Sequence, residues 1–129
     1  MSASDARSRA PLELRAFIDS IPALAWSTLP DGFPEFVNQR LQDYTGLSPD
    51  QISREWKPIL HSDDAEEFAN WWQSLQSSRK PGQTELRLRR FSGEYRWFQI
   101  AAAPIHDEQG NLVRWYGINT DIDERKRAS

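Results

Sequence analysis

The sequence of 129 residues contains no cysteine, one methionine and two histidines, and this scarcity excludes several kinds of chemistry. Without a thiol, the chain has no disulfide scaffold, no thiolate nucleophile and no cysteine-ligated zinc. His61 and His106 lack the spacing of a metal site, so we expect no bound metal. No apolar run is long enough to cross a membrane, and the polar start MSASDARSRA does not resemble a signal peptide. We therefore expect a cytoplasmic protein without a membrane span.

An excess of positive charge is also absent, because 16 Lys and Arg stand against 19 Asp and Glu, which gives a net charge of −3. Proteins that bind nucleic acid usually carry a basic excess, so we expect no nucleic-acid partner. A sheet surface on which bases stack needs aromatic and basic groups close together. The candidates for such a surface in this chain are Arg87, Arg89, Arg96, Arg114, Trp97 and Tyr116. The glycine–aromatic signature of such a surface is missing, which favours a solvated sheet and a dimer surface.

Large aromatic residues are plentiful by comparison, with six tryptophans and six phenylalanines. The length is that of one domain with short tails. A chain of this size buries roughly two-thirds of the surface that its unfolded form exposes. We therefore expect one core with large side chains.

The chain begins with polar and small residues, and we predict a disordered tail over residues 1–10. Pro11 suits the first position of a helix and Pro22 ends it, which predicts a flanking helix over residues 11–22. Its apolar side chains recur at helical spacing on one face: Leu14, Phe17, Ile18 and Ile21. A helix this short is marginal alone, so this face must dock on another surface.

Two strands over residues 23–28 and 33–38 flank the turn signal at residues 29–32 and form a hairpin. Asn38 is placed to cap a short helix over residues 40–44, and Gly46 is placed to stop it. Ser48 and Pro49 start a further helical turn, and residues 55–60 form another short segment. One long helix follows, opened by residues 61–64, with Asp63 and Glu66 as a capping box.

The long helix has a buried stripe of Phe68, Trp72 and Leu75, with Trp71 at its edge, and ends by Ser78. Residues 85–123 then contain three runs typical of strands, separated by turn signals at residues 92–94 and 107–111. Such short connections join antiparallel neighbours, so we predict a meander. The fold class is α+β: one five-stranded antiparallel sheet with the short helices and the long helix on one face. The N-terminal helix is the expected cover of the other face.

This order of elements resembles a PAS domain of the bacterial signalling type. The resemblance lies in the run VNQRLQDYTGLSPDQI, the HSDD helix start, the RRFSGEYRWF hairpin and the ending GINTDIDERKRA, and it covers roughly residues 17–126. It implies a PAS domain over residues 23–122 and the start of a signalling helix over residues 123–129. Such domains commonly end in Asp-Ile-Thr, where this chain has Asp121-Ile122-Asp123. The departure at Asp123 alters the expected cap of the exit helix.

The resemblance implies a sensory and dimerising module that serves a histidine kinase, a diguanylate cyclase or a transcription regulator. Any kinase activity would lie outside this chain, and the output domain would be covalently attached or docked. The implied signal relay from the last strand into the exit helix comprises Thr120, Asp121, Ile122 and Asp123. A homodimer would use the N-terminal helix and the outer face of the sheet: Leu14, Phe17, Ile18, Ile21, Trp97, Tyr116 and Ile118.

A ligand pocket between helices and sheet would have as its wall Trp26, Phe36, Trp56, Phe68, Trp72, Leu86, Leu88, Phe98, Ile100 and Asn119. So many large side chains leave little room, and they equally describe a filled core. Asn119 is the member best suited to a ligand, because a buried amide needs partners. An unknown small ligand therefore stays open beside a ligand-free module for homodimerisation or docking.

Flavin and haem are both disfavoured by the resemblance itself. Flavin-binding relatives of the light-sensing kind use a reactive cysteine, which is absent, and amides on two strands where Leu88 and Phe98 stand. Haem-binding relatives can place a histidine on the long helix, and residues 65–77 contain none. The acidic residues Asp63, Asp64, Glu66 and Glu67 indicate a capped helix start rather than a catalytic carboxylate pair, since no nucleophile or base accompanies them. A small α+β enzyme is the least favoured alternative.

Overall fold

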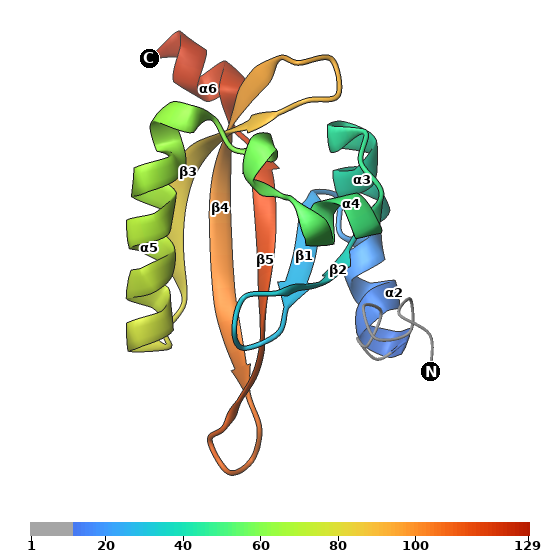
Figure 1. The fold of residues 1–129 in the computed structure, drawn as a ribbon, viewed down its shortest axis with the longest axis vertical. Coiled ribbons are helices and arrows are strands. Elements are labelled where there is room, and N and C mark those ends of the chain that lie inside the picture. Colours follow the sequence, from blue (N-terminus) through green and yellow to red (C-terminus); the bar gives the residue numbers. More distant parts are fainter. Residues whose placement is uncertain (1–11) are drawn as a thin grey trace.

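The computed structural model describes residues 12–129, so the predicted tail and Pro11 lie outside the described residues. The elements form two layers, with a sheet beneath a set of helices (Figure 1). The helices are α2 (Leu12–Ser20), α3 (Gln39–Thr45), α4 (Pro49–Arg54), η1 (Lys57–Ile59), η2 (Ser62–Asp64), α5 (Ala65–Ser78) and α6 (Asp123–Ala128). The strands are β1 (Leu24–Thr28), β2 (Pro34–Val37), β3 (Gly82–Arg89), β4 (Tyr95–His106) and β5 (Leu112–Asp121).

The strands pair as one antiparallel sheet in the order β2-β1-β5-β4-β3, which confirms the predicted α+β class. The first hairpin and the later meander join where β1 pairs with β5, with Trp26 opposite Gly117. A Cβ on Gly117 would lie 2.1 Å from the Trp26 ring. A glycine here therefore makes room for a large aromatic on the neighbouring strand.

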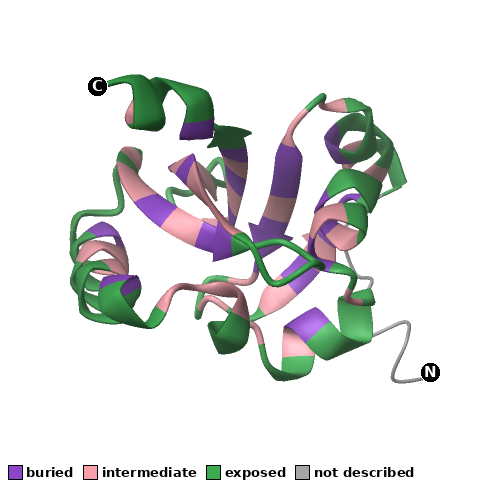
Figure 2. Cartoon of the chain, turned by 90° about the horizontal axis from the view of Figure 1, so that it is seen from above, coloured by how far each residue is buried: buried purple, intermediate pink, exposed green. Residues whose placement is uncertain are grey.

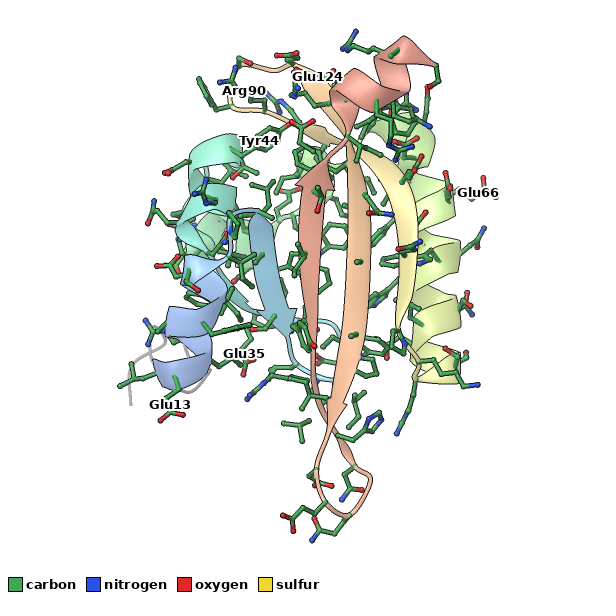
Figure 3. All side chains as sticks on the ribbon, turned by 180° about the vertical axis from the view of Figure 1, so that it is seen from behind. Glu13, Glu35, Tyr44, Glu66, Arg90 and Glu124 are labelled. Carbon is green, nitrogen blue, oxygen red and sulfur yellow. The ribbon has the colours of Figure 1, made fainter. Side chains whose placement is uncertain are left out.

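The helices α3, α4 and α5 cover one face of the sheet (Figures 1 and 3). Burial is greatest on the strands beneath them (Figure 2). The core combines alternate residues of the strands, among them Leu86, Phe98 and Ile100, with Leu41, Ile52 and Leu75 of the helices, and Trp115 is fully buried. The alternation predicted for β3 and β4 is confirmed by this burial, because side chains of a strand point to opposite faces.

Asn38 caps α3 as predicted and also ties three segments together. Its buried Oδ1 accepts hydrogen bonds from Leu41 N at 3.0 Å and Ala25 N at 3.1 Å. Its Nδ2 donates to the carbonyl oxygens of Ile18 at 3.2 Å and Ala23 at 2.8 Å. One amide thus uses both its donor and its acceptor capacity, which suits a side chain with no exposed surface.

The predicted docking face of the first helix is only partly correct. Ile18 is 2% exposed, but Phe17 is 62% exposed and does not pack on the sheet. The helix α2 contacts β1 and β2, at one edge of the outer face. In the view from behind, it leaves the middle of β3, β4 and β5 uncovered by any described helix (Figure 3). A helix docked at an edge buries a narrow line of residues rather than a broad stripe.

The predicted capping box of Asp63 and Glu66 is wrong. His61 caps the turn η2 instead, since its Nδ1 accepts a hydrogen bond from Asp63 N at 3.0 Å. The helix α5 starts one residue later than the box requires, after Asp64, which makes no capping bond with its side chain. The Asp64 carboxylate turns toward β3 and binds Arg87, a stronger partner than a backbone amide at a helix start.

Candidate functional site

A cavity of about 170 Å³ lies between the helical layer and the sheet. It is lined by most of the predicted wall, namely Trp26, Trp56, Phe68, Trp72, Leu86, Leu88, Ile100 and Asn119. The aromatic rings of α5 form one side, with Phe68 5.0 Å from Trp56 and Trp72 6.5 Å from Trp26 between ring centres. The core of large side chains is therefore not completely filled.

Two predicted wall residues do not line this cavity. Phe98 is 2% exposed and packs edge-on against Tyr44, with 5.0 Å between ring centres, deeper in the core. Phe36 pairs with Ser27 on the outer face, where the guanidinium of Arg15 stacks on its ring at 5.6 Å. The assignment of Phe36 was wrong by one residue, because Val37 is the partner of Trp26 and points inward.

The short helices α3, α4 and η1 and the residue after η1 supply wall residues that the sequence did not single out: Leu41, Thr45, Ile52, Ile59 and Leu60. Leu41 and Thr45 stand four residues apart on α3, a spacing that places them on one helix face. Helices of this length carry too few turns for a hydrophobic stripe to stand out. The i, i+4 spacing that places these two side chains on the cavity face was therefore present in the sequence, but it extends over too few residues to be recognised.

Asn119 is the amide of the cavity wall and is 7% exposed. Its Oδ1 accepts a hydrogen bond from Trp26 Nε1 at 2.9 Å. Within residues 12–129, its Nδ2 donates no hydrogen bond. The amide thus holds the Trp26 ring in place and retains donor capacity.

The predicted relay residues meet at the junction of β5 and α6. Arg96 Nε lies 2.8 Å from Asp121 Oδ2, and Arg96 Nη1 lies 3.7 Å from Asp123. Asp121 Oδ1 also accepts from Asp123 N at 2.9 Å, and Ile122 N donates to Trp97 O at 2.9 Å. Thr120 is exposed and pairs with Gln99 on β4.

Asp123, the residue that departs from the expected Asp-Ile-Thr ending, is almost fully buried. Its carboxylate accepts hydrogen bonds from the Arg127 side chain and from Trp97 N at 3.0 Å. These two bonds hold the pKa of Asp123 below its ordinary value against the opposing effect of desolvation. The departure therefore joins the first turn of α6 to β4.

A second connection links the start of α5 to α6, and the sequence did not reveal it. Asp64, which is 4% exposed, binds the Arg87 guanidinium at 2.7 Å and 3.1 Å and the Arg87 backbone N at 2.8 Å. Burial raises the pKa of Asp64, but the bonds to Arg87 outweigh it and lower the pKa. Arg87 in turn stacks on Trp97 at 4.9 Å, and Lys126 stacks on the same ring at 4.4 Å.

Glu85 completes this arrangement, because its carboxylate binds Arg125 and Lys126 of α6, each at 3.0 Å. We call Asp64, Arg87, Trp97, Glu85 and Lys126 the Trp97 bridge. It runs from Asp64, the residue before the helix α5 that carries the cavity residues Phe68 and Trp72, to the last helix of the chain. Its residues come from four elements that are distant in the sequence, so no local sequence pattern predicts it.

The comparison with known proteins agrees with this architecture. The sequence profile of the PAS fold matches residues 34–119. The chain belongs to the PAS fold family. A PAS domain from Colwellia psychrerythraea has a TM-score of 0.71 and 26% identity, with 88% of this chain and 98% of that chain covered.

Among sequence relatives, the peroxide stress-activated histidine kinase mak1 of Schizosaccharomyces pombe is 35% identical over 117 residues. The match covers 89% of this chain and only 7% of that kinase. A light-oxygen-voltage domain, solved in a study of a flavin analogue, has a TM-score of 0.75 but 15% identity, over 93% of this chain and 92% of that chain. That likeness shows the shared fold.

The cavity of this PAS domain does not fit a flavin or a haem. Drug-sized ligands need roughly 300–1,000 Å³, which exceeds the 170 Å³ between its walls. The β3 and β4 positions that line the cavity are apolar, with Leu88 on β3 and Ile100 on β4, and neither can hydrogen-bond the edge of a flavin ring. The polar strand residues of the lining are Ser27 and Thr28 on β1 and Asn119 on β5. The cavity lining contains no His, Met or Tyr, and the sequence has no Cys, so the lining offers no axial ligand for a haem iron. Within the described residues, no group of three or more His, Asp and Glu could hold a metal ion.

The side chains predicted for a dimer surface lie at several places in the structure. Tyr116 and Ile118 line a hollow of about 400 Å³ on the outer face of the sheet. Trp97 lies in the bridge to α6, while Ile18 is buried in the fold and Phe17 is exposed on α2. Leu14 and Ile21 are half-buried. None of the helices described in residues 12–129 is long and apolar enough to cross a membrane.

Proposed function

We propose that this PAS domain is the sensory input module of a larger signalling protein and responds to a small, largely apolar ligand. The observation that carries the proposal is the pairing of a partly empty apolar cavity with the Trp97 bridge. The helix α5 contributes to both, through Phe68 and Trp72 at the cavity and through the residue before its start, Asp64, at the bridge. A ligand that moves α5 therefore acts on α6.

The cavity sets the class of ligand. An engineered apolar cavity of about 150 Å³ in another protein stays dry and binds benzene, and the present cavity has a similar volume of 170 Å³. Its lining is apolar apart from groups such as Asn119, whose Nδ2 can donate to one acceptor on a ligand. The ligand is thus a single-ring or short aliphatic compound without charge, since a charge here would be buried unpaired.

Two routes carry the signal to α6 in this proposal. The first is the predicted relay along β5, which ends in the contacts of Asp121 and Asp123 with Arg96. The second is the Trp97 bridge from the start of α5. A coupling free energy of about 1–3 kcal/mol is enough to bias an attached output domain, which matches the modest strength of such partly exposed contacts.

The output domain is proposed to be a sensor histidine kinase, in keeping with the relative from Schizosaccharomyces pombe. A diguanylate cyclase or a transcription regulator is the alternative output. The chain itself is proposed to be non-catalytic and cytoplasmic, with the output domain attached after α6 or docked on it.

Native mass spectrometry of the freshly purified domain tests the ligand. The proposal predicts a reproducible added mass below about 200 Da, the size that suits a cavity near that of the benzene-binding case. In a separate NMR experiment, titration of the ¹⁵N-labelled domain with benzene should shift the amide signals of Leu86 and Ile100 until the cavity is saturated. A domain that carries no added mass and takes up no benzene would contradict the ligand proposal.

A ligand-free homodimer is the second candidate, and it is favoured by exposed apolar side chains on α2. Leu12 is 77% exposed and Phe17 is 62% exposed. Sedimentation across a hundredfold range of concentration tests this candidate. A dimer that is weakened in Phe17→Ser supports it, and a monomer at every concentration rules it out.

A further inference from the structure

A groove of about 650 Å³ lies outside the inner cavity, between the hairpin of β3 and β4 and the helices α3 and α4. Its floor is apolar, with Leu47, Pro58, Ile59 and Phe91. Its rim carries three arginines: Arg54, Arg89 and Arg90. The volume lies within the range of about 300–1,000 Å³ that small-molecule sites occupy.

The three arginines are the unusual part of this groove. Within residues 12–129, none of them forms an ion pair, and the lining includes one carboxylate, Glu55. The chain as a whole has a net charge of −3, so three cations around one groove are a local excess of positive charge. Like charges held close together repel, and a bound anion would relieve that repulsion.

Phe91 supplies an aromatic surface beside these cations. Its side chain is 60% exposed, and the Arg90 guanidinium stacks on its ring at 4.7 Å. An exposed ring of this kind leaves apolar area that a flat ligand can cover. The groove therefore presents an apolar surface and guanidinium donors side by side.

The wall that carries Phe91 is held firmly. Phe91 N donates to Tyr44 O at 2.8 Å, and the Tyr44 hydroxyl donates to Leu88 O at 2.8 Å. Gly46 packs so closely that a Cβ there would lie 2.9 Å from Phe91 Cβ. Arg90 and Tyr44 lie at this end of the molecule in Figure 3. A site with fixed walls loses little entropy when it binds a ligand.

We propose that this groove binds a small organic anion that joins a flat apolar body to a phosphate, sulfonate or carboxylate group. The anionic group takes the arginine rim, where planar guanidinium groups match its oxygens. The apolar body covers Phe91 and the floor. Thr45 and Ile59 line both the groove and the inner cavity, so the two sites share part of a wall. The groove site does not depend on the ligand proposed for the inner cavity.

The test is a titration of the ¹⁵N-labelled chain with phenyl phosphate, compared with inorganic phosphate and with benzyl alcohol. Phenyl phosphate should give saturable shifts at Gly46, Leu47 and Phe91 and should bind more tightly than either comparison compound. Arg89→Ala or Arg54→Ala should weaken it about tenfold, the loss of one charge-assisted hydrogen bond. Phe91→Ala should weaken phenyl phosphate and leave inorganic phosphate unchanged.

Arg40→Ala is the matched control, because Arg40 is an exposed arginine on α3 that is not part of the groove lining. Its effect should stay within twofold. The proposal is overturned if phenyl phosphate gives no saturable shifts in the groove, if Arg40→Ala weakens it as much as Arg89→Ala, or if benzyl alcohol binds equally well. The signals of Leu86 and Ile100 report the inner cavity separately, so failure at the two sites can be told apart.

Discussion

The ammonium nitrogen of Lys126 lies 4.4 Å from the centre of the Trp97 ring, on which the Arg87 guanidinium also stacks at 4.9 Å. Besides the bonds of Asp123 to β4, this aromatic ring and the ion pairs of Glu85 hold the last helix on the sheet. Partly exposed cation–π contacts contribute roughly 0.5–2 kcal/mol each. Contacts of this size are comparable with a coupling free energy of about 1–3 kcal/mol.

Replacement of Lys126 by Met should loosen α6 without unfolding the domain. The change removes the charge that binds both Trp97 and Glu85 but keeps a chain of similar length. Amides of residues 124–128 should exchange hydrogen about threefold to tenfold faster, the effect of about 0.6–1.4 kcal/mol. Glu124→Gln is the control, since the exposed Glu124 side chain forms no hydrogen bond or ion pair within residues 12–129. Equal hydrogen exchange in Lys126→Met and in the unchanged chain would contradict the claim that the Trp97 bridge holds α6.

Asp64→Asn should destabilise the fold by about 1–3 kcal/mol, because it removes the charged partner of Arg87 at a buried site. The neighbouring Asp63 is exposed and does not pair with Arg87, so Asp63→Asn should change the stability by less than about 0.5 kcal/mol. Urea denaturation measures both. A loss of stability that is similar in the two variants would indicate a general effect of charge at the helix start rather than the specific pair.

Gly117→Ala should displace Trp26, since the added Cβ would lie 2.1 Å from its ring. We expect a loss of about 1–3 kcal/mol from overpacking and reduced uptake of benzene, because Trp26 is part of the cavity wall. The cost should fall when the same change is made in Trp26→Phe, whose ring is smaller. A double-mutant cycle by urea denaturation measures this coupling, and strictly additive costs would contradict the contact.

Acid should release α6 through Glu85, Asp123 and Asp64. Each carboxyl has a pKa below its ordinary value: the Arg125 and Lys126 bonds lower that of Glu85 from 4.5, and the Arg127 and Trp97 bonds lower that of Asp123 from 3.8. Groups with a depressed folded pKa stabilise the fold above the pKa of the unfolded chain. That stability starts to fall near pH 4 to 4.5 and is lost as the pH drops through the folded values.

The pH dependence is checked by urea midpoints between pH 3 and pH 7, with Glu85→Gln as the comparison. The substitution should lower stability at pH 7 and flatten its decline in acid, because one titrating group is removed. An unchanged slope in Glu85→Gln would show that Glu85 does not contribute to the acid response.

Much of the fold could be predicted from local patterns. The caps at Asn38 and Ser48, the stop at Gly46 and the turn signals of the meander act between residues close in the chain, and all are found in the structure. The alternation in β3 and β4 identified the inward side chains correctly, since its period depends only on the strand. Short-range physics therefore determined the elements and most of the cavity wall.

The errors arose where contacts over long sequence distance compete with local ones. Asp64 binds Arg87, which lies 23 residues away, instead of capping α5. Phe36 faces outward because the pairing of β2 with β1 decides its side of the sheet. The Trp97 bridge joins residues from distant elements, and a single sequence shows no trace of such a pairing. Patterns of spacing predict faces of elements, whereas tertiary pairing decides which faces meet.

Hydrogen exchange at Lys126 and Arg127, with and without saturating benzene, tests the central claim most directly. Benzene is the probe for the inner cavity, and its entry is verified by the signals of Leu86 and Ile100 in the same sample. The account predicts that exchange at α6 changes by at least twofold when the cavity is filled, and that Asp64→Asn reduces this change. Occupancy of the cavity with exchange at α6 unaltered would contradict the coupling between them.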